Sequence, residues 1–239
     1  MKTSNKILTI VAAAVIVLGL GLIIGIRVIL HNVEQETGFI QSKPSFSAGD
    51  WIEKEYEYGD FKQVEFTGGW KAELESGEEY RIAVRLPEEL EDVLEVKKKG
   101  GTLMVGTDGI YDMDGKHFEV KITMPELEAV EVTGGIDARL SGFTGSTFLI
   151  EGSGGLNVVA KDCRYDDLRF ETSGGANAEL RDMPVRNAHI ESAGALNMVL
   201  TMEGGELSGR ISGVCSLDYY GEVSNNTLSV SGVSSISHK

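Results

Sequence analysis

The second half of the chain alternates apolar and polar residues with a period of two, and glycines interrupt this pattern at nearly equal intervals. Positions two, four and six after each such glycine are mostly apolar, and the positions between them are mostly polar. Alternation of this kind is typical of strands buried on one face. The glycines that lead the intervals are Gly134, Gly154, Gly174, Gly194, Gly213 and Gly232. Steps of 19 or 20 residues in strand-rich sequence predict a solenoid with one coil per interval.

Each lead glycine is expected at a corner between two short strands, because glycine accepts positive φ and lets neighbouring backbones approach closely. Nine residues after three of these glycines stand Phe143, Cys163 and Met183, which we expect to point inward. The other cysteine, Cys215, follows its own glycine by two residues. The two cysteines should therefore lie on different edges of the body, too far apart for a disulfide. We predict two buried free thiols.

An earlier copy of the corner phrase, Thr67-Gly68-Gly69, matches Thr133-Gly134-Gly135. Between them the interval is lost, and strand-like runs are separated by turn signals such as Lys99-Gly100-Gly101. We interpret residues 51–128 as an irregular first half and residues 129–239 as regular coils of one body. The predicted fold class is all-β, a right-handed parallel β-helix or β-solenoid with coils of about 20 residues, preceded by one N-terminal transmembrane helix.

The segment from Ile7 to Ile26 has no charged residue, is preceded by Lys2 and Lys6, and is followed by Arg27. Twenty apolar residues are enough to cross the bilayer core. No small-x-small cleavage site follows, so an uncleaved signal anchor is favoured over a removed signal peptide. The basic flank predicts that the N-terminus lies inside. The predicted domains are an anchor at 1–30, a linker at 31–50 and a β body at 51–239.

These features predict a single-pass membrane protein with its body outside the cytoplasm. The chain has 37 acidic against 22 basic residues and a net charge of −15. This balance argues against nucleic acid as a partner, because nucleic-acid binders carry basic patches. It permits cations, basic partners or neutral glycans. No pair of histidines has metal-ligand spacing, so neither a metal site nor a cofactor is expected.

The residues that flank the corner glycines form two candidate rows of oxygen atoms. Three residues before a glycine stand Glu131, Glu151, Glu171 and Glu191. Three residues after a glycine stand Asp137, Asn157, Asn177 and Asn197. By their parity both sets face solvent and stack about 5 Å apart. One hypothesis is a binding face for calcium or for a hydroxyl-rich ligand. The structural alternative is a solvated acidic face whose asparagines hydrogen-bond to one another along the stack.

Together these phrases resemble a known family. The corner phrases, the earlier segment from Phe61 to Gly69, and the segment from Ile122 to Leu127 that precedes Val130-Glu131-Val132-Thr133-Gly134 are similar to the bacterial head GIN domain family. Its members are described as putative auto-transporter adhesins. The resemblance covers about residues 60–237. It implies a β-solenoid body, export to the cell envelope, and no known catalytic residues.

We therefore expect a non-catalytic, membrane-anchored adhesion or binding module that contacts an unidentified envelope protein or glycan. One alternative is a polysaccharide-active enzyme that uses the acids near Asp162, Asp166 and Asp167, since glycoside cleavage needs paired carboxylates. Another is a structural or signalling partner of an envelope protein. A homo-oligomer that covers the open strand edge at the C-terminal end is a further hypothesis.

Overall fold

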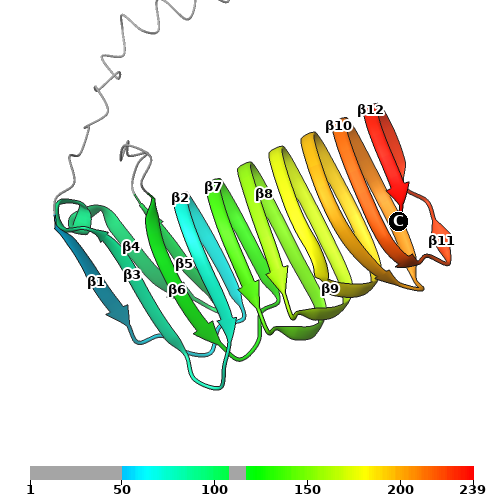
Figure 1. The fold of residues 1–239 in the computed structure, drawn as a ribbon. Coiled ribbons are helices and arrows are strands. Elements are labelled where there is room, and N and C mark those ends of the chain that lie inside the picture. The colour runs from blue at the N-terminus through cyan, green and yellow to red at the C-terminus, as the bar shows by residue number, and fades with distance from the viewer. Residues whose placement is uncertain (1–49, 108–116) are drawn as a thin grey trace, which may run out of the picture. The chain divides into compact units, whose positions relative to one another are not determined.

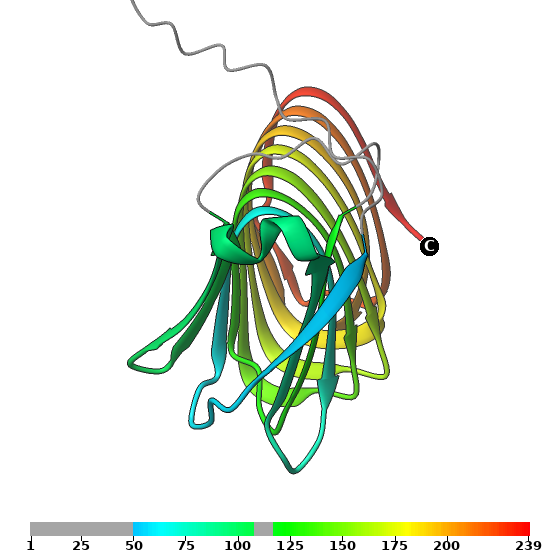
Figure 2. The ribbon, with the colours of Figure 1, turned by 90° about the vertical axis from the view of Figure 1, so that its left-hand side faces the viewer.

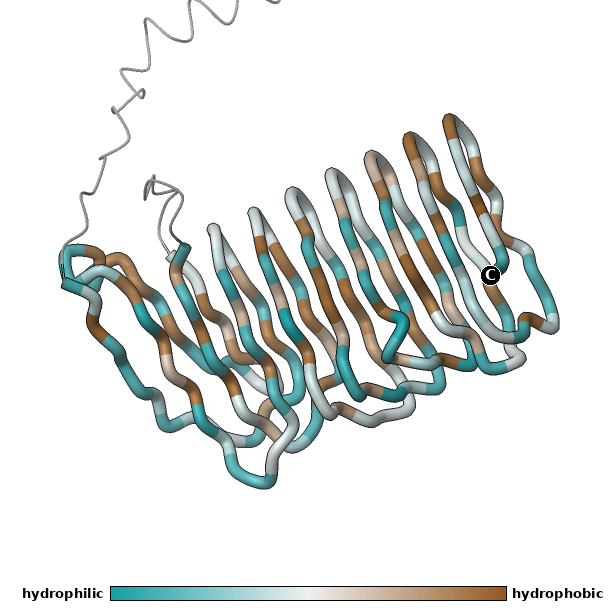
Figure 3. Tube along the Cα trace, viewed as in Figure 1, coloured by the Kyte–Doolittle hydropathy of each residue, from teal (hydrophilic) through white to brown (hydrophobic). Residues whose placement is uncertain are grey.

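A computed structural model describes residues 50–107 and 117–239, which belong to one compact unit spanning Ser45–Lys239. The described residues form one sheet of twelve strands with a single short helix (Figure 1). Alternate residues along each strand face a common core. Figure 3 shows this alternation as apolar and polar bands along the chain trace.

The later part of the sheet is parallel. Its first strand, β7 (Ala129–Ser141), pairs with β8, and β8 pairs with β9. β9 is 40 residues long, contains the two corners at Gly174 and Gly194, and pairs with β10 through its second half, from Ala188 to Glu203. The strands after β7 are β8 (Thr144–Lys161), β9 (Arg164–Glu203), β10 (Glu206–Glu222), β11 (Asn225–Asn226) and β12 (Ser229–His238).

The earlier part of the sheet is mixed. β1 pairs antiparallel with β3, β3 with β6, and β4 with β5, whereas β2 pairs in parallel with β5, β6 and β7. Figure 2 shows the helix η1 at this end of the sheet. The elements are β1 (Trp51–Tyr56), β2 (Gln63–Ser76), β3 (Arg81–Pro87), η1 (Glu88–Val93), β4 (Leu94–Lys99), β5 (Thr102–Thr107) and β6 (Phe118–Met124).

The predicted core positions are confirmed. Leu156, Ala176 and Leu196, each two residues after a glycine, are 4%, 7% and 3% exposed, and the first two are paired neighbours in the sheet. The inward positions nine residues after a glycine are also buried, as are both cysteines, which are free thiols. Burial raises the pKa of the Cys163 and Cys215 thiols. The core is therefore continuous along the parallel part of the sheet.

The lead glycines lie in register from strand to strand, and we call them the corner glycines. Gly68 pairs with Gly134, Gly134 with Gly154, and Gly154 with Gly174. All have positive φ, for example 126° at Gly154 and 130° at Gly174. A Cβ at Gly174 would collide with the carbonyl oxygen of Gly154. Only glycine satisfies both the backbone conformation and this close approach, as the sequence predicted. The corner glycines are Gly68, Gly134, Gly154, Gly174, Gly194, Gly213 and Gly232.

The predicted fold class is wrong in its central claim of a parallel β-helix. The structure is a mixed, open sheet in which three strand pairs are antiparallel. The physical reason lies in the turns of the first half. β4 and β5 are joined through Gly100, whose φ is 61°, and such a tight turn reverses the chain between adjacent strands.

The predicted transmembrane helix and the localisation derived from it are also corrected. Within residues 50–107 and 117–239, no helix is long and apolar enough to cross a bilayer. The segment on which the prediction rested, residues 1–30, lies outside the described residues. The single-pass membrane localisation is therefore not retained.

Candidate binding face

The predicted glutamates lie side by side in the sheet. Glu131 pairs with Glu151, and Glu151 pairs with Glu171. The structure adds Glu65 before the first of them, because Glu65 pairs with Glu131. Neighbouring strands lie about 4.8 Å apart, so these carboxylates are close neighbours. We call this set, which is Glu65, Glu131, Glu151, Glu171 and Glu191, the carboxylate row.

A groove of about 400 Å³ runs along the carboxylate row. The exposed hydroxyl-bearing residues Thr133, Ser153 and Ser173, which directly precede corner glycines, also line it. At one end of the groove Arg210 takes the position next to Glu191. The groove therefore offers carboxylates, hydroxyls and one guanidinium to a ligand.

Electrostatic repulsion is concentrated at the end of the row that contains Glu131. Partial burial raises the pKa of the Glu131 carboxyl, and the nearby charges of Glu151 and Glu65 raise it further. No ion pair to Glu65, Glu131 or Glu151 is formed by any described residue. This end of the row therefore carries negative charge without ion pairs, and we call it uncompensated in this sense, although the charge of Arg169 also acts on Glu151.

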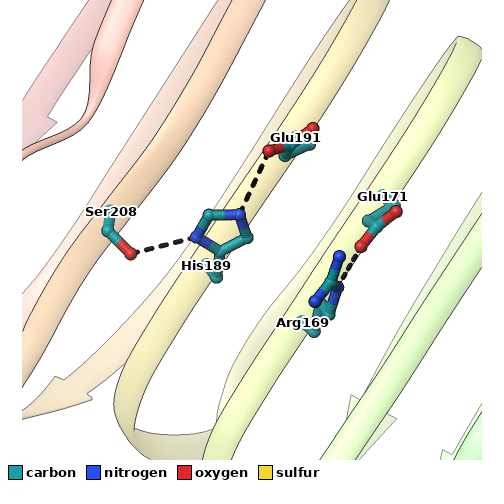
Figure 4. Close-up of polar contacts among 5 residues, drawn as sticks. All are labelled: Arg169, Glu171, His189, Glu191 and Ser208. Atoms are coloured by element: carbon teal, nitrogen blue, oxygen red, sulfur yellow. Dashed lines mark hydrogen bonds and ion pairs between the residues drawn. The ribbon is translucent and has the colours of Figure 1, made fainter.

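The other end of the row carries its own bases, as Figure 4 shows. Arg169 donates a hydrogen bond to Glu171 on the same strand. His189 Nε2 lies 3.3 Å from a carboxylate oxygen of Glu191, and its Nδ1 lies 3.1 Å from Ser208 Oγ. In β-strands, residues two apart lie on the same face, so each of these bases faces its glutamate. The row is thus divided into an uncompensated half and a compensated half.

The Ser208–His189–Glu191 contacts have the order of a nucleophile, a base and a carboxylate. The side chains of His189 and Glu191 are 40% and 57% exposed, however, so water reaches both. Activated nucleophiles are usually held in sites that exclude water and supply donors for a developing oxyanion. We interpret the contacts as polar links between neighbouring strands.

The second predicted set lies on the other side of the corner glycines. Asn157 Nδ2 donates to Asp137 Oδ1 at 2.9 Å, Asn177 donates to Asn157 at 2.7 Å, and Asn197 donates to Asn177 at 2.7 Å. The hydrogen-bonded stack expected under the structural alternative is therefore present. Stacked side-chain amides of this kind stabilise neighbouring strands. We call these four residues the amide row.

The remaining acidic residues singled out in the sequence lie in and beside one turn. Asp162 has a φ of 53°, which suits its place between β8 and β9. Asp167 accepts a hydrogen bond of 2.7 Å from Asn187, and Asp166 is exposed. In the described part of the chain, no group of three or more His, Cys, Asp or Glu side chains is placed to hold a metal ion.

Sequence reasoning missed two features of this face. Glu65 could have been found by extending the alignment of the Gly68 phrase backwards by three residues. The pairs Arg169–Glu171 and His189–Glu191 could have been found from their spacing of two residues, which places them on one face of a strand. Thr172 and Ser192 are different, because alternation places both side chains inward but no sequence pattern indicates that their hydroxyl oxygens lack a hydrogen-bond partner among the described residues.

The chain belongs to the family described as "Putative auto-transporter adhesin, head GIN domain", whose model matches residues 60–183, more than half of the chain. The resemblance noted from the corner phrases is thereby confirmed. A comparison with curated proteins gave no match.

Two solved structures have a similar fold. A putative adhesin from Bacteroides fragilis is 15% identical, with a TM-score of 0.63, and the match covers 80% of this chain and 98% of that one. A putative adhesin from Parabacteroides merdae is 19% identical, with a TM-score of 0.50 and coverage of 81% and 98%. At these identities the similarity shows the fold alone. The family and both structures are described as adhesins and not as enzymes.

Proposed function

We propose that the protein is a non-catalytic binding module of the adhesion type, and that it contacts its ligand through the groove along the carboxylate row. The observation that carries this proposal is the alignment of five carboxylates, each three residues before a corner glycine, beside a line of exposed hydroxyls. The membership of the adhesin family supports a binding role outside the cell.

The chemistry of the groove indicates the class of ligand. Carboxylates accept hydrogen bonds, and the hydroxyls both donate and accept them. Neutral glycans and basic protein segments offer complementary donors, whereas polyanions would be repelled by the uncompensated carboxylates. Because the groups recur about every 4.8 Å, an elongated ligand can make several contacts at once. Several weak contacts along one molecule sum to useful affinity.

The amide row is a less favourable contact surface. Each of its asparagines already uses one amide hydrogen for its neighbour. Binding a ligand there would compete with hydrogen bonds that hold adjacent strands together. We therefore assign the amide row a structural role and the carboxylate row the contact role.

A binding screen with the full chain tests the proposal. Immobilised neutral glycans and extracellular proteins would be probed with the wild type and with a variant carrying Glu65→Gln, Glu131→Gln and Glu151→Gln. We expect the variant to bind at least about tenfold more weakly, which corresponds to about 1.4 kcal/mol. Binding of basic ligands should also weaken with added salt, because the contacts are exposed to solvent.

A charge-matched control separates local contacts from net charge. Asp166→Asn, Asp182→Asn and Glu222→Gln remove the same number of negative charges from exposed positions outside the groove. This control should bind like the wild type. Equal binding by the groove variant would exclude the carboxylate row as the contact surface. The absence of any ligand in the screen would contradict the assignment as a binding module.

A further inference from the structure

The two ends of the sheet differ in how their edges are protected. At the first end, β1 carries Glu53, Lys54 and Glu55, and Lys54 donates a hydrogen bond of 2.6 Å to Glu91 of η1. Leu90 of the same helix is buried, at 2% exposed. Charged side chains and a covering helix are the usual means of blocking an edge strand. The first end is therefore unsuited to adding another strand.

The other end has the opposite character. In the described part of the chain, large apolar side chains are exposed at three positions, and all lie on the last two long strands. Val214 of β10 is 60% exposed, and its neighbour Val233 of β12 is 72% exposed. Ile236 of β12 is 40% exposed, although the equivalent residue of β10, Leu217, is fully buried. Val214 and Val233 directly follow corner glycines and point outward, since Val214 is exposed although it is paired on both sides. Ile236 has the inward parity of Leu217 and is exposed because no described strand lies beyond β12.

β12 also presents an uncharged edge. It pairs with β10 through ten residues, from Ser229 with Arg210 to His238 with Tyr219, and with no other described strand. From Ser229 to Ser237 the strand contains no charged side chain. An edge strand with free backbone donors and acceptors, small side chains and no charge is a template for pairing with another strand.

We propose that β12 pairs antiparallel with the β12 of a second copy of this chain, about a two-fold axis, so that the two sheets form one. A two-fold axis brings the same strand of each copy together, and strands related in this way run in opposite directions. The pairing would cover Ile236 of both copies, bring their Val233 side chains next to the partner edge, and satisfy the open backbone groups.

The charge distribution makes this edge the place where a second copy can approach most closely. With a net charge of −15, two chains repel each other over most of their surfaces. The uncharged stretch of β12 allows close approach with little of this penalty. Ser234 stands two residues after its corner glycine, a position that is mostly apolar at the other corners. Its hydroxyl keeps this edge compatible with water in the separated chains.

Light scattering of the full chain tests the proposal. We expect particles with twice the mass of one chain. Val233→Lys places a charge in the centre of the pairing edge and should raise the dissociation constant at least tenfold. Because Val233 is exposed, this change should leave the fold intact, which circular dichroism would verify. Ser146→Lys adds the same charge at an exposed position of β8 and should leave the dimer unchanged. A monomer at all concentrations, or a dimer insensitive to Val233→Lys, would overturn the proposal.

Cysteine cross-linking locates the interface. Single cysteines placed in turn from Ser229 to Ser237 should form intermolecular disulfides most readily at the residue nearest the two-fold axis and less readily on either side. The native Cys163 and Cys215 are buried and will contribute little background. Glu53→Cys on β1 is the control and should not cross-link. Cross-linking between a Glu53→Cys chain and a Ser235→Cys chain would indicate head-to-tail assembly and would contradict the two-fold pairing.

Discussion

Residues 51–124 and residues 129–238 use the same alternation of buried and exposed side chains, but they produce different sheets. In the later region, each strand bends at a corner glycine, and neighbouring strands are parallel and in register. In the earlier region, hairpin turns reverse the chain and several strands are antiparallel. The burial pattern sets which side chains face the core, and the turns set the strand direction.

β2 marks the boundary between these two regions. On one side it pairs without interruption with β7, from Gln63 with Ala129 to Glu75 with Ser141. On the other side it pairs with β5 before its corner and with β6 after it. β2 is therefore continuous through the corner at Gly68 and Gly69, whereas its neighbours on one side, β5 and β6, are two separate strands. Uninterrupted parallel pairing across a corner begins with β2 and β7, where a corner glycine is present in both partners.

Substituting a corner glycine should have the largest effect on stability. Gly174→Ala places a Cβ against the Gly154 carbonyl oxygen and forces a side chain into a φ of 130°. We expect unfolding free energy to fall by about 3 kcal/mol or more, as measured by urea denaturation. Gly175→Ala, where a Cβ meets nothing within 4 Å, should change it by less than about 0.5 kcal/mol.

The hairpin glycine of the earlier region provides the comparison. Gly100→Ala also places alanine at positive φ, but a Cβ there meets no atom within 4 Å. The expected loss is about 1 kcal/mol, from the backbone conformation alone. Equal losses for Gly174→Ala and Gly100→Ala would show that close backbone approach is not what requires glycine at the corners.

Removing the buried hydroxyl of Tyr165 should cause the next largest loss of stability. This hydroxyl links the regular region to the segment that precedes β7. It donates a hydrogen bond of 2.8 Å to the Leu127 carbonyl. Burial raises the pKa of this phenol, so the hydroxyl keeps its proton. Tyr165→Phe leaves a buried acceptor without its donor and should destabilise by about 1–2 kcal/mol. Tyr220→Phe, at a partly exposed tyrosine, should change the unfolding free energy little in urea denaturation. An equal loss in both variants would contradict a stabilising role for the buried hydrogen bond of Tyr165.

Removing an unsatisfied hydroxyl should stabilise the later region. Thr172 is 7% exposed, and its Oγ1 has no partner among the described residues. Thr172→Val keeps the shape of the side chain and removes the desolvated oxygen, so we expect a gain of about 1 kcal/mol. The exposed Thr133→Val is the control and should change the melting temperature little. A destabilised Thr172→Val variant would indicate that a bound water satisfies this hydroxyl.

The smallest expected effect comes from the carboxylate row and depends on pH. The pKa of Glu131 is raised in the folded state, so the unfolded chain loses this proton first as the pH rises. The folded state is therefore penalised as the pH passes through the folded pKa, and the penalty is absent in acid. Glu131→Gln should stabilise at neutral pH by less than about 0.5 kcal/mol, because solvent still reaches this half-buried group and screens the repulsion, and the gain should vanish in acid. A gain that persists in acid would contradict repulsion as its cause.

The sequence was sufficient for the regular region and insufficient for the earlier one. Corner glycines, buried positions and the alignment of Glu131, Glu151 and Glu171 followed from spacing and alternation. The antiparallel pairing of β1 with β3 did not, because alternation is identical in parallel and antiparallel strands. The hairpin at Gly100 was visible as a turn signal, but its effect on the whole sheet depends on contacts between distant segments. Alternation also places Thr172 and Ser192 inward, but whether their hydroxyls find hydrogen-bond partners depends on local packing and carries no sequence signature.

The division of the carboxylate row gives the groove a polarity. Glu65, Glu131 and Glu151 present carboxylates without ion pairs at one end, whereas the guanidinium groups of Arg169 and Arg210 bring positive charge to the other. A ligand with unlike ends would therefore settle in one orientation and be disfavoured in the reverse. The groove would thus distinguish the two ends of an elongated ligand without a dedicated recognition loop.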